Sequence, residues 1–126
     1  MKLDFKNTKV LLIGDFMIDH YLMGQSTRMS PEAPIPVVTP EKEYSIPGGA
    51  GNVAMNLATL GASVTCIGCL GNDIWGKKLL SILSNKGINT KNIEVIDEHP
   101  TTLKKRIFSN NKQIARIDYE KIIDWQ

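Results

Sequence analysis

The sequence predicts an α/β fold in which a parallel β-sheet is flanked by helices. One observation is a short, mainly apolar run, residues 8–13, that ends in Gly14 and Asp15, as buried strands of parallel sheets often do. The other is the alternation of helical and strand patterns between residues 50 and 96, which is typical of parallel strands joined by helices.

We expect the first run to be a central strand buried on both faces, because its apolar residues do not alternate with polar ones. The next stretch contains Pro31, Pro34, Pro36 and Pro40. Proline lacks the backbone N–H group that helix interiors and central strands require. This stretch is therefore predicted to be extended, and edge-like or lid-like.

A helix is predicted over residues 50–60. Gly61 follows it and permits the left-handed conformation that often ends helices. The polar residues Asn52, Asn56 and Thr59 fall at i, i+4 and i+7 and form one narrow stripe. We expect a helix with so little polar surface to be mostly buried.

The pattern then continues as strand, helix, strand. Residues 63–70 form an apolar run, and Asp73 is a good N-cap for a second helix. Apolar residues at helical spacing over 75–83 support that helix, and Gly87 ends it. Residues 92–96 form another short strand.

A β-hairpin is predicted near the end of the sequence. Residues 102–108 and 113–118 have strand character, and Asn110 and Asn111 lie between them. Asparagine tolerates the left-handed backbone conformation that tight hairpin turns need.

Composition narrows the class of protein. The chain has 126 residues, 42% hydrophobic and 22% charged, with a net charge of +2. This size suits one domain or part of one, and the weak, scattered charge does not favour nucleic acid or a membrane surface as a partner. No apolar run approaches the roughly 20 residues of a membrane span, and the N-terminus lacks a signal-peptide core. We therefore expect a cytoplasmic protein.

The two cysteines, Cys66 and Cys69, have the spacing of a redox or zinc motif. However, they lie inside an apolar, β-branched run rather than at a helix start, and no second cysteine pair completes a zinc site. We interpret both as small buried hydrophobic residues and predict no metal site.

A glycine-rich segment at the start of the first helix is the sharpest motif. Residues 48–54 read Gly-Gly-Ala-Gly-Asn-Val-Ala. Small residues there let backbone N–H groups approach a ligand, and the helix dipole favours oxygen-rich groups. The amide of Asn52 both donates and accepts hydrogen bonds, as sugar hydroxyls do. Gly48, Gly49 and Asn52 are therefore candidate sugar-binding residues.

This segment, followed at fixed spacing by Gly61 and Gly71, resembles the first signature of the PfkB, or ribokinase-like, carbohydrate kinases. The resemblance runs from about residue 9 to residue 120. It implies that the chain is the N-terminal portion, residues 1–126, of one ribokinase-like domain with a small β lid, formed by segments at about 20–46 and 100–119. It also implies that Asp19 binds sugar hydroxyls.

Residues 26–38, 99–106 and 113–120 resemble the heptose 7-phosphate kinase domains that often belong to bifunctional enzymes. The resemblance implies ATP-dependent phosphorylation of D-glycero-D-manno-heptose 7-phosphate at its anomeric oxygen, a step toward ADP-heptose and the lipopolysaccharide core. Ribokinase-, fructokinase- and nucleoside-kinase-like specificities stay open.

Basic residues on the predicted hairpin fit a phosphorylated substrate. Lys104 and Arg106 share one face of a strand, and lysine and arginine bind phosphate well. A plain two-residue turn pairs Arg116 with Lys105, and so places Arg116 on the opposite face. Arg116 is therefore the weaker candidate, and a solvated hairpin charge is the competing interpretation for all three.

The later motif that supplies the general base in this family, and the nucleotide pocket beyond it, are not found in the sequence. No catalytic residue is therefore assigned, and the chain alone is expected to be inactive. ATP and Mg²⁺ are expected in the intact enzyme but not on this chain. The resemblance further implies a homodimer formed through the lid.

Two other functions remain open. Residues 49–54 match the glycine fingerprint of dinucleotide-binding oxidoreductases, although the segment before them is polar and ends in Pro47 rather than being a buried strand. The other alternative is a non-catalytic remnant or sugar-binding module, because the catalytic motif is missing.

Overall fold

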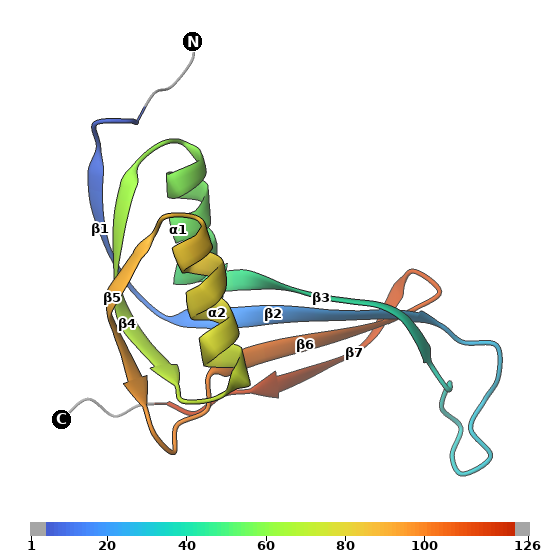
Figure 1. The fold of residues 1–126 in the computed structure, drawn as a ribbon. Helices are drawn as coiled ribbons and strands as arrows, with labels where there is room; N and C mark the ends of the chain where they lie inside the picture. Colours follow the sequence, from blue (N-terminus) through green and yellow to red (C-terminus); the bar gives the residue numbers. More distant parts are fainter. Residues whose placement is uncertain (1–4, 123–126) are drawn as a thin grey trace.

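The computed structural model describes residues 5–122, which form two β-sheets and two helices (Figure 1). In chain order the elements are β1 (Lys9–Ile13), β2 (Phe16–Gln25), β3 (Thr39–Gly49), α1 (Ala50–Thr59), β4 (Ser63–Gly71), α2 (Ile74–Asn85), β5 (Asn89–Ile96), β6 (Thr102–Ser109) and β7 (Lys112–Tyr119). No helix in this part of the chain is long and apolar enough to cross a membrane.

The predicted parallel sheet is confirmed. Strands β1, β4 and β5 form a three-stranded sheet in the order β1-β4-β5, and both neighbouring pairs are parallel. Helices α1 and α2 lie on one side of it (Figure 1). Val64 and Cys66 of β4 are buried in the same core as Leu79 and Leu83 of α2.

Two burial predictions are wrong, and both for the same reason. Strand β1 lies at the sheet edge with helices on one side only, so Leu11 and Ile13 are 60% and 69% exposed rather than buried. Helix α1 contacts the sheet along a narrow strip, and only Gly51 and Ala54 are buried. In a single layer of helices, each helix keeps one face in water.

The second sheet has four strands in the order β3-β2-β6-β7 and extends away from the helices (Figure 1). Strand β2 pairs with β3 antiparallel and with β6 parallel, and β6 pairs with β7 antiparallel. Pro40 and Pro47 lie in β3, an edge strand, where a missing N–H group breaks no ladder bond on the outer side. Of the four prolines in the predicted stretch, only Pro40 lies in this edge strand. Pro31 and Pro34 lie in the bends between β2 and β3, and Pro36 pairs with Met29 in an isolated bridge, so the edge-like prediction holds for Pro40 alone.

The hairpin of β6 and β7 is also confirmed, but its register is not the predicted one. Asn110 and Asn111 have φ values of 49° and 65°, as a left-handed turn requires. A bulge in β7 at Ile114 then shifts the pairing by one residue, so Arg116 lies opposite Arg106. An extra residue in one strand moves every later side chain to the other face. Arg116 and Arg106 therefore share a face, contrary to the prediction.

Asp73 caps helix α2, as predicted. Its Oδ1 accepts hydrogen bonds from the backbone N–H groups of Trp75 (3.0 Å) and Gly76 (2.8 Å), and its Oδ2 accepts one from that of Thr101 (2.8 Å). Burial raises the pKa of Asp73, but these hydrogen bonds lower it more, so the pKa lies below its ordinary value. One carboxylate thus joins the start of α2 to the start of β6.

Replacing Asp73 with alanine should lower the free energy of unfolding by about 1–2 kcal/mol at pH 7, because a helix cap is lost. The folded-state pKa lies below the unfolded-state one, so the carboxylate stabilises fully above roughly pH 4 and less as the pH falls through the folded value. Urea unfolding of both proteins at pH 7 and pH 3 measures this. If the two proteins differed in free energy of unfolding by the same amount at both pH values, the charge of Asp73 would have no role in the cap.

Candidate functional site

One face of the four-stranded sheet gathers five of the seven residues that the sequence predicted for substrate binding. We call it the Asp19 face. The pairings Met17 with Gly48, Asp19 with Lys104, and Arg106 with Arg116 define it, because directly paired residues point to the same side. The predicted members on it are Asp19, Gly48, Lys104, Arg106 and Arg116.

The centre of this face is an ion pair. Arg106 Nη1 donates to Asp19 Oδ1 at 2.5 Å, and the two side chains are only 21% and 18% exposed. The hydrogen bond to Asp19 raises the pKa of Arg106, so the guanidinium stays charged. Its carbon also lies 5.3 Å from the ring centroid of Tyr21, which holds it from a second side.

Gly48 fits against the other oxygen of the same carboxylate. A Cβ atom at this position would lie 2.6 Å from Asp19 Oδ2, which is closer than van der Waals contact allows. The missing side chain therefore leaves Asp19 room in its present orientation. With Oδ1 held by Arg106, Oδ2 is the oxygen available to accept hydrogen bonds from a ligand.

A second carboxylate, which the sequence analysis did not single out, organises the other two cations. Asp118 Oδ1 lies 2.9 Å from Arg116 Nε, and Asp118 Oδ2 lies 3.6 Å from Lys104 Nζ. The three predicted cations and the two carboxylates leave one net positive charge in this cluster. Asp118 could have been found only with the correct hairpin register, since that register places it opposite Lys104.

An aromatic row crosses the same face beside the ion pair. Tyr21 stacks on Tyr44 with ring centroids 4.9 Å apart and planes within 7°, and Phe108 lies 6.2 Å from Tyr21 on the other side. Such pairs stabilise neighbouring strands. Tyr21 follows Asp19 by two residues, so strand periodicity would have placed it on this face if β2 had been predicted as a strand.

The remaining two predicted residues lie at the start of α1. Gly49 has a φ of 54°, and a Cβ there would lie 2.5 Å from the carbonyl oxygen of Asp15, so only glycine suits the position. The N–H of Ala50 donates to the same oxygen at 2.9 Å. The side chain of Asn52 is exposed in the first turn of α1, and Asn52 is not part of the Asp19 face.

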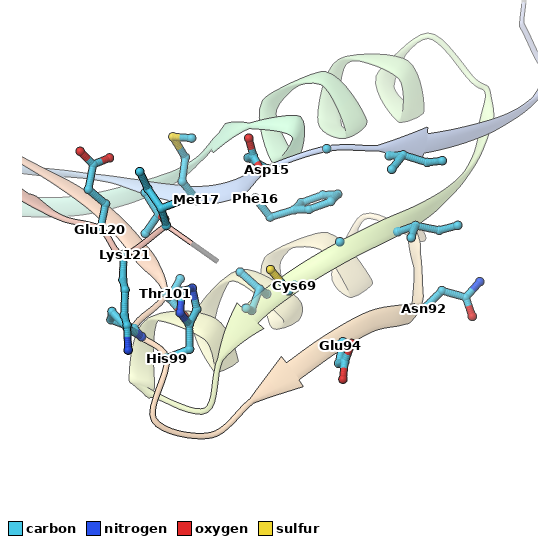
Figure 2. A pocket seen from close by; sticks show the side chains of 18 residues that line it. Asp15, Phe16, Met17, Cys69, Asn92, Glu94, His99, Thr101, Glu120 and Lys121 are labelled. Atoms are coloured by element: carbon cyan, nitrogen blue, oxygen red, sulfur yellow. The ribbon is translucent and has the colours of Figure 1, made fainter. Parts of the chain in front are cut away.

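A cavity of about 700 Å³ adjoins this face on the open side of the three-stranded sheet (Figure 2). Met17 and Thr102 line it, and they precede Asp19 and Lys104 in their rows on the Asp19 face. None of the seven predicted residues lines it. Asp15, to which the sequence analysis gave no role, does line the cavity. It lies at the carboxyl end of β1, where α/β sheets commonly bind ligands.

The cysteine interpretation holds for one residue only. Cys66 is fully buried in the core, whereas Cys69 is partly exposed and lines the cavity (Figure 2). Burial raises the pKa of both thiols, and for Cys69 the carboxylates of Asp15 and Glu94 raise it further. Since residues alternate along β4, Cys69 points to the uncovered side of the sheet.

The dinucleotide-binding alternative is not supported by the fold. Its fingerprint requires a buried parallel strand that leads directly into the glycine turn and helix. Here the glycines follow β3, which is an antiparallel edge strand of the other sheet. The helix start therefore lacks the strand context in which that fingerprint binds a pyrophosphate.

Solved structures with the same fold are sugar kinases. The ribokinase of Arabidopsis thaliana, complexed with ribose and ATP, matches with a TM-score of 0.70 at 19% identity over 89% of this chain and 35% of its own. The fructokinase of Halothermothrix orenii matches with a TM-score of 0.64 at 24% identity over 90% of this chain and 37% of its own. The fold is therefore ribokinase-like, as predicted.

Residues 7–121 match the pfkB family carbohydrate kinases, and the chain belongs to this family. The bifunctional protein HldE of Coxiella burnetii (strain RSA 331) is 42% identical over 119 residues, 94% of this chain and 25% of the relative. HldE of Helicobacter pylori (strain J99) is 47% identical over 112 residues, 89% of this chain and 24% of the relative. The chain thus spans about a quarter of the length of these relatives.

The accessibility of the cavity can be tested through its cysteine. A thiol reagent should modify Cys69 but not Cys66 in the native protein, and both in urea, because only Cys69 faces the cavity. The native reaction should be slow at pH 7 and quicken up to and beyond pH 9, since the thiolate is the nucleophile and the pKa of Cys69 is raised.

Absorbance of the released chromophore follows this reaction. The variant Cys69→Ser should lose the native reaction, and Cys66→Ser should keep it. Equal native reactivity of both thiols would show that the open side of the sheet is not as the structure describes it.

Proposed function

We propose that the chain is the N-terminal, sugar-binding portion of an ATP-dependent carbohydrate kinase. Its substrate would be D-glycero-D-manno-heptose 7-phosphate, phosphorylated at the anomeric oxygen for ADP-heptose and lipopolysaccharide core synthesis. Family membership and the 42–47% identity to HldE proteins support this assignment. So does the resemblance of residues 26–38 to heptose 7-phosphate kinases.

The observation that carries the proposal is the arrangement of Asp19 between Arg106 and Gly48. A carboxylate with one oxygen fixed and the other free is suited to accept hydrogen bonds from sugar hydroxyls, and its charge makes such bonds strong. The substrate would bind between the Asp19 face and the cavity, which Met17 and Thr102 connect. Gly49 and Asn52, at the start of α1, would contribute backbone and amide groups from another side.

The cations of the Asp19 face fit the phosphate of such a substrate. Arg116 and Lys104 both contact the carboxylate of Asp118, so a phosphate group would find two donors that are already close together. All three cations are paired with a carboxylate, but Arg116 is 50% exposed and Lys104 lies 3.6 Å from its partner, whereas Arg106 is only 21% exposed and lies 2.5 Å from Asp19. We therefore assign the phosphate contact first to Arg116 and Lys104.

Phosphoryl transfer from ATP normally uses Mg²⁺, which neutralises charge on the transferring group. Among residues 5–122 no group of three or more His, Cys, Asp or Glu side chains could hold a metal ion, so none of them is assigned to it. ATP and Mg²⁺ belong to the intact kinase in this proposal. A kinase that draws on the cellular ATP pool would work in the cytoplasm.

The substitution Asp19→Asn tests the sugar site, because it keeps the shape and removes the charge. It should weaken binding of heptose 7-phosphate to the full-length kinase about 10- to 100-fold, as expected for losing a charged hydrogen bond. Titration calorimetry measures the dissociation constant. Asp97→Asn, on an exposed residue at the end of β5, is the matched control.

Arg116→Gln should weaken binding of heptose 7-phosphate but not of unphosphorylated heptose, and Lys112→Gln in the same strand should change neither. If Asp19→Asn bound heptose 7-phosphate as tightly as the parent protein, the proposed site would be wrong. Sugar binding by the full-length protein with no phosphoryl transfer would instead favour the non-catalytic sugar-binding module.

A homodimer through the four-stranded sheet is part of the same proposal, in which this sheet is the lid. Strand β7 is an edge strand, exposed along its whole length, and carries the half-exposed Ile117 and Tyr119. The unpaired backbone groups of such an edge can bind another strand. A second copy, offering the same edge, would cover these side chains.

Ile117→Lys should therefore shift the protein from dimer to monomer, because a charge would be placed where the two edges meet. Sedimentation velocity over a range of concentrations measures this. The control is Ile74→Lys, which adds the same charge at a more exposed isoleucine of α2. A wild-type protein that is monomeric at all concentrations would rule the dimer out.

A further inference from the structure

Helix α2 contacts the four-stranded sheet through a small polar and aromatic cluster, which we call the α2 joint. His20 of β2 and Ser45 of β3 form its sheet side, and Trp75 and Lys78 of α2 form its helix side. His20 is only 4% exposed, although it is an ionisable side chain. It points away from the Asp19 face, so the proposed sugar site does not use it.

Both ring nitrogens of His20 have partners. Nε2 lies 3.0 Å from Glu43 Oε2, and Nδ1 lies 2.8 Å from Ser45 Oγ. A carboxylate only accepts hydrogen bonds, so Nε2 carries the hydrogen. Nδ1 and the hydroxyl of Ser45 share the second hydrogen bond.

The helix side completes this chain of hydrogen bonds. Lys78 Nζ, which can only donate, lies 3.0 Å from Ser45 Oγ. It also lies 5.5 Å over the ring of Trp75, and that ring packs against His20 with centroids 5.0 Å apart. A continuous chain of hydrogen bonds therefore links Lys78 of the helix through Ser45 and His20 to Glu43 of the sheet.

Ser45, His20 and Glu43 have the order of groups found in hydrolase triads, but the arrangement lacks what catalysis needs. Neither the cavity of about 700 Å³ nor the second one of about 320 Å³ is lined by Ser45 or His20. Ser45 is also occupied by the ammonium group of Lys78. Ser45 thus lies outside both cavities and already binds Lys78, so we interpret the cluster as a joint between elements.

We propose that His20 is a positioning residue for the sugar site. This inference rests on the proposed function. His20 is not proposed to contact the sugar. It is the residue next to Asp19 on β2, and its side chain projects from the other side of the strand. By fixing β2 and β3 to α2, the joint sets the angle of the four-stranded sheet. That angle determines how far Asp19 stands from the cavity and from the start of α1.

The angle can be measured as a distance between spin labels in the full-length protein. One label is placed on β5 at Lys91→Cys and the other on β7 at Gln113→Cys, both exposed positions, with Cys69→Ser in the background and Cys66 left buried. The parent protein should give one narrow distance distribution. Lys78→Met should broaden it, because it removes the donor to Ser45 from the protein surface without altering the core.

Lys77→Met, the neighbouring exposed lysine of α2, is the matched control and should leave the distribution narrow. His20→Phe keeps a ring against Trp75 but loses both hydrogen bonds, and should broaden the distribution as well. His20→Gln retains a donor and an acceptor and should restore most of the parent behaviour. This rescue would not be seen if the residue only filled space.

The same variants are then titrated with heptose 7-phosphate. Lys78→Met and His20→Phe should raise the dissociation constant about tenfold or more, since small displacements of binding groups are costly. A distribution that stays narrow in both variants overturns the proposal, and so does a broadened one with unchanged affinity. A parent protein that binds no sugar overturns the proposed function and with it the positioning role, while the distances still show whether the joint sets the angle.

Discussion

The parallel pairing of β2 with β6 is the constraint on which the site depends. It places Asp19 beside Lys104 and brings Arg106 onto Asp19, although these last two residues are 87 positions apart in the chain. Parallel neighbours cannot be joined by a tight turn, so the chain between them must make a long excursion. That excursion contains both helices and most of the three-stranded sheet, which means that the site forms only when the whole fold has formed.

Sequence reasoning succeeded where the signal is local. The cap at Asp73, the left-handed turn at Asn110 and Asn111, and the glycines after both helices each depend on a few neighbouring residues. It failed where the structure depends on distant partners. The bulge at Ile114, which puts Arg116 beside Arg106, has no local signature, and the burial of β1 depends on which layers cover it.

The residues of the candidate site divide along the same line. Asp19, Lys104 and Arg106 could be chosen from residue type, strand periodicity and family resemblance, and the fold brings them together. The contribution of Asp118 could not be predicted, because it pairs with Lys104 only in the bulged register. Nor could sequence reasoning show that Asn52 stands apart from the cluster, since that depends on the angle between a helix and a separate sheet.

The uncovered side of the three-stranded sheet connects stability with function. Leu11 and Ile13 are exposed there, and burying such side chains is worth roughly 1.5–3 kcal/mol each. The same side carries the cavity that adjoins the Asp19 face. Any polypeptide that covered Leu11 and Ile13 would therefore also wall the cavity, so completing the hydrophobic core and enclosing the ligand would be a single event. Such a cover would also exclude water from Met17 and Thr102, which line the cavity next to Asp19 and Lys104, and electrostatic interactions strengthen where water is removed.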